Sequence, residues 1–294
     1  HDPDGFGTIY HRLGSYGPGV TPITDDRHQV TSHDSAGDAA LCERFCDEAL
    51  GTQTHAYSLL WICDPDHTQH EVALGSPRHI QSIMDADACA GRVYDRVKEL
   101  NAAGEDILLL VGSDHGHETV GGVVDLNALL VEAGLKENTT SSDVVVASNG
   151  LSANIYLSDE ARDRLPRIIP FLRELDDVDQ VFSGTNLSRL GHRTGTALAI
   201  AVTTKGTDDV NEFGIPGISI AVQDPLHTDT RLGCGQHGGL GPNEQNPFLM
   251  VHGGGFVSGT THSKRSSAID LAPTVLRHLG QDWEGMDGVP LDQS

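Results

Sequence analysis

Three segments that lie far apart in the sequence are rich in carboxylate and imidazole side chains. They are residues 66–70 (DHTQH), 112–117 (GSDHGH) and 235–239 (GQHGG). Imidazole groups bind zinc or iron, and carboxylates also bind manganese or magnesium. One tetrahedral zinc ion needs only four ligands, whereas two neighbouring ions hold both oxygens of an in-line phosphoryl displacement. The five candidate metal ligands therefore predict a dinuclear metallohydrolase: Asp66, His70, Asp114, His115 and His237.

Two of these segments follow apolar runs that predict buried strands. Residues 57–63 are apolar except for Ser58, and residues 107–111 are apolar throughout, as in strands buried on both faces. Apolar residues at helical spacing predict helices over residues 35–50 and 77–102. Ligand sites in open α/β sheets collect at the carboxyl ends of the strands. We therefore expect both segments at one edge of a mostly parallel sheet sandwiched by helices.

The pattern changes after residue 118 and returns after residue 231. The intervening residues carry short apolar runs, a turn at Asn149-Gly150 and an irregular helix with two prolines. We predict that residues 1–118 and 232–294 form the two parts of an α/β core, and that residues 119–231 form an inserted small α+β cap. Further strands are predicted at 144–146, 153–157, 178–182, 197–202, 218–222 and 248–252, helices at 159–175 and 271–279, and a loop over 1–33.

The order and spacing of these motifs resemble the alkaline phosphatase superfamily, in the branch of type I phosphodiesterases, nucleotide pyrophosphatases and phosphonoacetate hydrolases. The resemblance rests on Pro65-Asp66 with His70, on Ser113-Asp114-His115-Gly116, on Gln236-His237-Gly238-Gly239 before Asn246-Pro247-Phe248, and on residues 267–274. It implies that Asp66, His70 and His237 bind one zinc ion and that Asp114 and His115 contribute to the other. Manganese or iron are the alternative metals.

The sequence departs from the family pattern in three respects. Gln69 stands where glycine is usual and His117 where methionine is common, and neither position is a ligand in the family. The family nucleophile is a serine or threonine at a helix start, far upstream of the first ligand pair, so we expect it upstream of His1. Asp4-Gly5 and Thr21-Pro22 only mimic the missing segments. His117 and His227 are expected to orient ligands or phosphate rather than to bind metal.

Charge and composition limit the partners. The net charge of −23 and the presence of only four lysines exclude a nucleic-acid scaffold as a partner, because phosphate backbones require a basic surface. The same acidity indicates a salt-adapted protein, with an ordinary acidic bacterial protein as the alternative. No apolar run approaches the roughly 18 residues of a membrane span. Five irregularly spaced cysteines do not form a disulfide framework.

The sequence therefore predicts a two-zinc hydrolase of phosphate esters, phosphodiesters or phosphonates that acts on a small phosphorylated or phosphonate substrate. Sulfatase or phosphomutase chemistry on the same scaffold is one alternative, and a catalytically incomplete metal-binding fragment is another. The compartment is cytoplasmic by default, with the periplasm or secretion left open, because the natural N-terminus is expected upstream. Substrate identity and oligomeric state are not determined by the sequence.

Overall fold

The computed structural model describes residues 7–24, 31–52, 55–225 and 230–293. Asp4, Gly5 and His227, which entered the sequence analysis, lie outside these residues. The chain divides into two compact units, which are described separately. The first contains residues 1–67, 80–114 and 248–294, and the second contains residues 68–79 and 115–247. These boundaries place both the histidines of the 115–117 segment and His237 in the second unit, whereas the predicted core and cap divide near residues 118 and 231.

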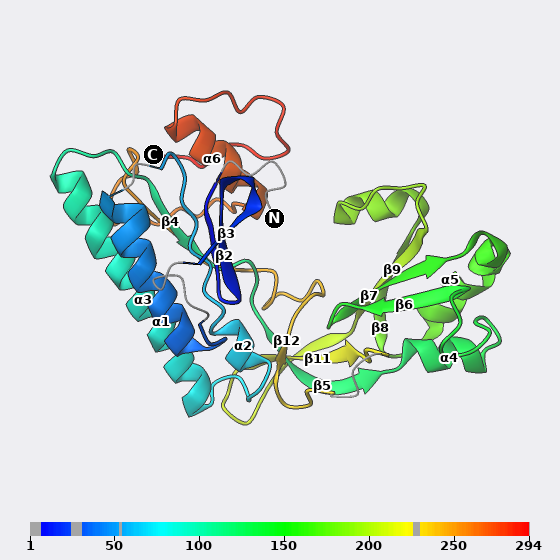
Figure 1. The fold of residues 1–294 in the computed structure, drawn as a ribbon. Helices are drawn as coiled ribbons and strands as arrows, with labels where there is room; N and C mark the ends of the chain where they lie inside the picture. Colours follow the sequence, from blue (N-terminus) through cyan, green and yellow to red (C-terminus); the bar gives the residue numbers. More distant parts are fainter. Residues whose placement is uncertain (1–6, 25–30, 53–54, 226–229, 294) are drawn as a thin grey trace. The chain divides into compact units, whose positions relative to one another are not determined.

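The first unit contains two small antiparallel sheets (Figure 1). β1 (Ile9–His11), β2 (Gly14–Gly17) and β3 (Thr21–Ile23) form one sheet in that order, with a short helix, η1 (Pro18–Val20), between the last two strands. The prediction of a continuous loop over residues 1–33 is therefore wrong for these strands. In the other sheet, β4 (Leu109–Gly112) pairs with β13 (Leu249–His252), both close to their predicted positions.

Helices α1 (Ser35–Arg44) and α3 (Pro77–Ala102) occur where apolar spacing predicts them. Asp34 caps α1, because its carboxylate accepts a hydrogen bond from the Gly37 N–H at 2.9 Å, and the helix continues as η3 (Phe45–Thr52). Cys42 packs with Cys89 on α3 in the core of this unit. Burial raises the pKa of the Cys42 thiol to about 12, so it is protonated near neutral pH. The unit closes with η6 (Ala268–Asp270) and α6 (Leu271–His278).

Residues 57–63 do not form the predicted strand. Tyr57, Leu59 and Trp61 are exposed by 61%, 66% and 64%, while the alternate residues Leu60 and Ile62 pack against the core around Cys42. The segment therefore buries one face rather than two. Its backbone also pairs differently, since the N–H groups of residues 63 and 64 donate to the carboxylate of Asp38 on α1 instead of to a neighbouring strand.

The second unit contains a mixed sheet with the order β10-β11-β5-β12. β5 (Glu118–Val124) and β11 (Pro216–Val222) are parallel, whereas β10 (Gly206–Val210) and β12 (Gly235–Gln236) pair antiparallel to their neighbours. The sequence analysis predicts β11 but misses the other three strands. β10 is exposed along its whole length and β12 has two residues, so neither shows the apolar alternation that identifies a strand.

A second sheet in this unit is fully antiparallel and has the order β6-β7-β9-β8. Its strands are β6 (Val144–Ser148), β7 (Ser152–Leu157), β8 (Val178–Ser183) and β9 (Leu198–Thr204). Helices α4 (Leu126–Glu132) and α5 (Leu165–Glu174) supply Leu126, Leu130 and Ile168 to the core of this unit, where all three are fully buried. Pro166 lies in the first turn of α5, which explains why the predicted helix over 159–175 is divided into η4 (Asp159–Arg164) and α5. Another short helix, η5 (Gly184–Leu190), precedes β9.

The α/β fold class is confirmed, but the described strands are not mostly parallel. Only β5 and β11 form a parallel pair among the described residues. The prediction of a mostly parallel sheet depends on a strand at 57–63 lying beside the strand at 107–111, and residues 57–63 are not a strand. None of the helices in the described parts of the chain has both the length and the hydropathy of a membrane span.

Candidate metal centre

His70 lies directly after the short helix α2 (Asp66–Gln69), and its ring is fixed by a backbone contact. Its Nδ1 lies 3.0 Å from the carbonyl oxygen of Gly235. Because a carbonyl oxygen only accepts hydrogen bonds, Nδ1 carries the proton and the lone pair remains on Nε2. That Nε2 lies 3.2 Å from Nε2 of His237. Two nitrogens bound tetrahedrally to one zinc ion at about 2.0–2.1 Å lie roughly 3.3 Å apart, so the observed separation fits a shared ion.

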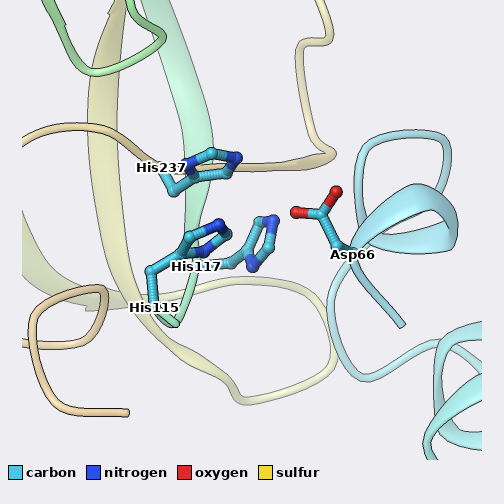
Figure 2. Close-up of side chains that lie close together, drawn as sticks. All are labelled: Asp66, His115, His117 and His237. Atoms are coloured by element: carbon cyan, nitrogen blue, oxygen red, sulfur yellow. The ribbon is translucent and has the colours of Figure 1, made fainter. Parts of the chain in front are cut away.

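His115 and His117 complete a group of four histidines in the second unit. Nδ1 of His115 lies 3.0 Å from the carbonyl oxygen of Gly116, which again places the proton of a neutral ring on Nδ1 and the lone pair on Nε2. Its ring stacks on the ring of His237, with centroids 3.6 Å apart. The ligand nitrogens of His115, His117 and His237 lie within 4.8 Å of one another (Figure 2). We call His70, His115, His117 and His237 the histidine cluster.

Strand pairing brings the segment that carries His115 and His117 next to the segment that carries His237. His117 directly precedes β5, and His237 directly follows β12. These strands are antiparallel, with Glu118 opposite Gln236 and Thr119 opposite Gly235. The residues on either side of this pairing are therefore held at the same end of the ladder, although they are separated by about 120 positions in the sequence. Figure 2 shows the histidine side chains beside the strands that carry them.

The turn between β6 and β7 supports the backbone at His237. The N–H of Leu151 donates to the carbonyl of His237 at 2.9 Å, and the hydroxyl of Ser152 donates to the carbonyl of Gly238 at 2.6 Å. Gly150 has a φ of +74°, and a Cβ built there would lie 2.1 Å from the carbonyl oxygen of His237. The Asn-Gly turn predicted from the sequence thus also forms part of the seat of a candidate metal ligand.

The predicted ligands do not all behave alike. His70, His115 and His237 come together, and the structure adds His117, which the sequence analysis assigned to an orienting role. His115 and His117 are two positions apart, and side chains at that spacing in extended backbone share a face, so this signal was available in the sequence.

The two predicted carboxylate ligands belong to the first unit, so the structure does not place them relative to the cluster. Asp66 begins α2, where Figure 2 draws it, and Asp114 is exposed directly before His115. Thr21, which mimics part of the family's nucleophile motif, is exposed at the start of β3, also in the first unit. Its hydroxyl donates to the carbonyl of Pro18 at 3.2 Å.

Gln69 departs from the family pattern without entering the cluster. Its Nε2 lies 2.9 Å from Nε2 of His79, a buried residue whose Nδ1 accepts a hydrogen bond from Gly75 at 2.7 Å. Burial, and next the neighbouring His117, lower the pKa of His79, which favours a neutral ring. The longer side chain at residue 69 is therefore accommodated by contact with the start of α3.

The donor set fits a borderline transition metal. Imidazole nitrogens are ligands for zinc, iron, copper and nickel, whereas magnesium and calcium prefer oxygen. Two of the four rings have their tautomer fixed by a backbone carbonyl, which orients a ligating histidine and raises its basicity.

Comparison with known proteins identifies the family. The sequence model of the family described as type I phosphodiesterase / nucleotide pyrophosphatase matches residues 10–184, more than half of the chain. The chain therefore belongs to this family, within the alkaline phosphatase superfamily. The matched range contains the segments around Asp66 and His115, and His237 lies beyond it. No curated protein matches the sequence.

One solved structure supports the fold, and a second shows a weaker likeness. Murine ectonucleotide pyrophosphatase/phosphodiesterase 5 has 19% sequence identity and a TM-score of 0.60 over 95% of this chain and 65% of that one. Phosphonoacetate hydrolase from Sinorhizobium meliloti, solved with phosphonoformate, has 18% identity and a TM-score of 0.47 over 80% of this chain and 55% of that one. The chain thus spans less than two thirds of either structure, and at these identities the likeness concerns the fold alone.

Proposed function

We propose that this protein is a zinc-dependent hydrolase of phosphate esters, phosphodiesters or phosphonates. The observation that carries the proposal is the histidine cluster, in which the Nε2 atoms of His70 and His237 are spaced as two ligands of one ion. Family membership supplies the reaction class. When bound, zinc would polarise a phosphoryl oxygen and stabilise a deprotonated nucleophile. Manganese or iron would bind the same nitrogens with different affinity.

The carboxylates extend the proposal to two ions. Asp66 and His70 stand four positions apart in one short sequence segment. We assign Asp66, His70 and His237 to one ion. Asp114 is joined directly to His115, and we assign this pair to the second ion. His117 would be a further ligand, because its ring nitrogen lies within 4.8 Å of the ligand nitrogens of His115 and His237.

The charge of the protein supports a role for the metal in binding substrate. A net charge of −23 repels a phosphate anion at long range, with an interaction that falls off within about 8–10 Å at physiological ionic strength. A local concentration of positive charge is required to hold the anion. Two divalent ions would supply four positive charges at the cluster. Four lysine side chains could not bring the same charge into so small a volume.

Metal analysis and anion binding test this function. Protein purified without chelator should contain zinc, and removal of the zinc should abolish the binding of inorganic phosphate and methylphosphonate measured by calorimetry. Cleavage of bis(4-nitrophenyl) phosphate should follow the zinc content, and 4-nitrophenyl sulfate serves as the comparison for sulfatase chemistry. Protein that binds no transition metal, or that binds phosphate equally with and without metal, would overturn the proposal. Loss of cleavage in Thr21→Ala with zinc retained would identify Thr21 as the nucleophile.

A further inference from the structure

Glu244 is a buried carboxylate close in the structure to the histidine cluster but outside it. The residue is 2% exposed, and both carboxylate oxygens accept hydrogen bonds from the backbone that follows His237. Oε2 accepts from the N–H of Gly239 at 2.8 Å, and Oε1 accepts from the N–H of Gly241 at 2.9 Å. The side chain therefore fixes the backbone after His237 at two residues, Gly239 and Gly241.

The main chain of the same residue reaches the other part of the cluster. The carbonyl oxygen of Glu244 accepts a hydrogen bond from the N–H of Gly116 at 2.8 Å, and Gly116 lies between His115 and His117 in the sequence. Gly116 also packs closely here, since a Cβ at this position would lie 2.2 Å from the carbonyl oxygen of Asn243. A single residue thus connects both histidine-bearing segments from within the second unit.

A second buried carboxylate supports this arrangement. Glu118, also 2% exposed, directly follows His117 and accepts hydrogen bonds at Oε1 from the backbone N–H and the side-chain amide of Asn243, each at 3.2 Å. Its other oxygen accepts from the hydroxyl of Ser219. Asn243 precedes Glu244, so the loop that carries Glu244 is itself fixed from the His117 side.

We propose that Glu244 is a positioning residue that sets the separation between the His115–His117 segment and His237, and thereby the affinity and geometry of the metal site. This inference rests on the proposed metal-binding function. Metal–nitrogen distances must fall within about 0.2 Å of their preferred values. A loop anchored at Gly239 and Gly241 restricts the movement of His237 more than a free loop would, and therefore keeps its ring nitrogen closer to one position. A carboxyl group suits this task because each of its two oxygens can accept a hydrogen bond.

Glu244→Gln tests the proposal with minimal change in shape. The amide keeps one acceptor oxygen but turns an N–H₂ group toward one of the two backbone donors, so one anchor is lost. We measure cobalt(II) affinity by chelator competition and record the visible absorption of the bound cobalt, which reports its ligand geometry. Metal affinity should fall about 10–100-fold and the cobalt spectrum should change. Glu244→Asp, which is one methylene shorter, should show the same direction of change and serves if the amide variant does not fold.

Asp143→Asn is the matched control in the same unit. Asp143 is a largely buried carboxylate that accepts hydrogen bonds from Ser141, Arg164 and the Glu137 N–H, and none of these residues belongs to the histidine cluster. It should lower the melting temperature while leaving cobalt affinity and spectrum as in wild type. Wild-type affinity and spectrum in both Glu244 variants would overturn the positioning role while leaving the metal site in place. Failure of the wild-type protein to bind cobalt or zinc would instead overturn the proposed function, and the positioning role with it.

Discussion

Substitution of Gly150 by alanine should weaken metal binding although Gly150 has no chemistry of its own. In the described structure the Cβ of alanine would lie 2.1 Å from the carbonyl oxygen of His237 and 2.8 Å from the side chain of Gln236. Ordinary contact begins near 3.4 Å, so the backbone of His237 or the turn must move by about 1 Å. That displacement is several times the tolerance of about 0.2 Å for a metal–nitrogen bond.

Gly134 provides a control with the same backbone conformation. Its φ is +68°, close to the +74° of Gly150, but a Cβ at Gly134 meets nothing within 4 Å. Alanine at a positive φ costs about 1–2 kcal/mol, offset in part by about 0.4–1 kcal/mol of lost flexibility in the unfolded chain. Both variants therefore carry the conformational cost, and only Gly150→Ala carries the contact with His237.

The assay compares zinc affinity by chelator competition with stability by urea unfolding. Gly134→Ala should lose about 1 kcal/mol of unfolding free energy and keep wild-type zinc affinity. Gly150→Ala should lose more stability and bind zinc at least 10-fold more weakly, because the His237 ligand is displaced. Equal zinc affinities in the two glycine variants would refute the claim that the β6–β7 turn seats His237.

Three further predictions use other parts of the chain. His117→Ala should reduce bound zinc, measured by elemental analysis, as strongly as His237→Ala does; unchanged zinc in the His117 variant would return that residue to an orienting role. Stability should rise with potassium chloride up to molar concentrations, because salt screens the net charge of −23; a melting temperature that is flat or falls with salt would contradict this. Burial acts to raise the pKa of Asp143, but hydrogen bonds from Ser141 and Arg164 outweigh it and lower that pKa to about 2. A lowered carboxyl pKa stabilises the fold at pH values above the ordinary 3.8, and this contribution is lost as the pH falls toward 2. Asp143→Asn should therefore be less stable than wild type by up to about 2 kcal/mol at pH 7 and equally stable near pH 2. Urea unfolding at both pH values measures this difference.

Four of the longer helices and seven of the thirteen described strands follow from local patterns in the sequence. Helix α4 and the other six strands do not: β1, β2, β3, β5, β10 and β12. α3 begins and ends where apolar spacing predicts it, and α1 begins at the predicted residue 35. The sequence also predicted the family and the segments that carry the expected ligands, because residue type and order along the chain are sufficient to recognise a motif. The matching family model confirms the family over residues 10–184, and the ligand assignments remain predictions.

Residues 57–63 show where local pattern fails. An apolar run states that a segment avoids water, but it does not state whether its backbone will pair with a strand or with a side chain. Here the carboxylate of Asp38, some 25 positions earlier, takes the N–H groups at the end of the run, and no strand forms. Hydrogen-bond partners at such separations depend on how α1 packs, which single-sequence periodicity does not contain.

The sequence by itself determined which side chains could bind a metal: imidazole and carboxylate groups in three short segments. Only the tertiary structure decided which of them meet. The antiparallel pairing of β5 with β12 places His117 and His237 at one end of a ladder, and the carbonyl of Gly235 selects the tautomer of His70. These contacts join residues more than a hundred positions apart. A coordination site requires ligand positions that are correct to within a few tenths of an ångström, and such positions are set by the packing of the whole unit and not by the spacing of motifs.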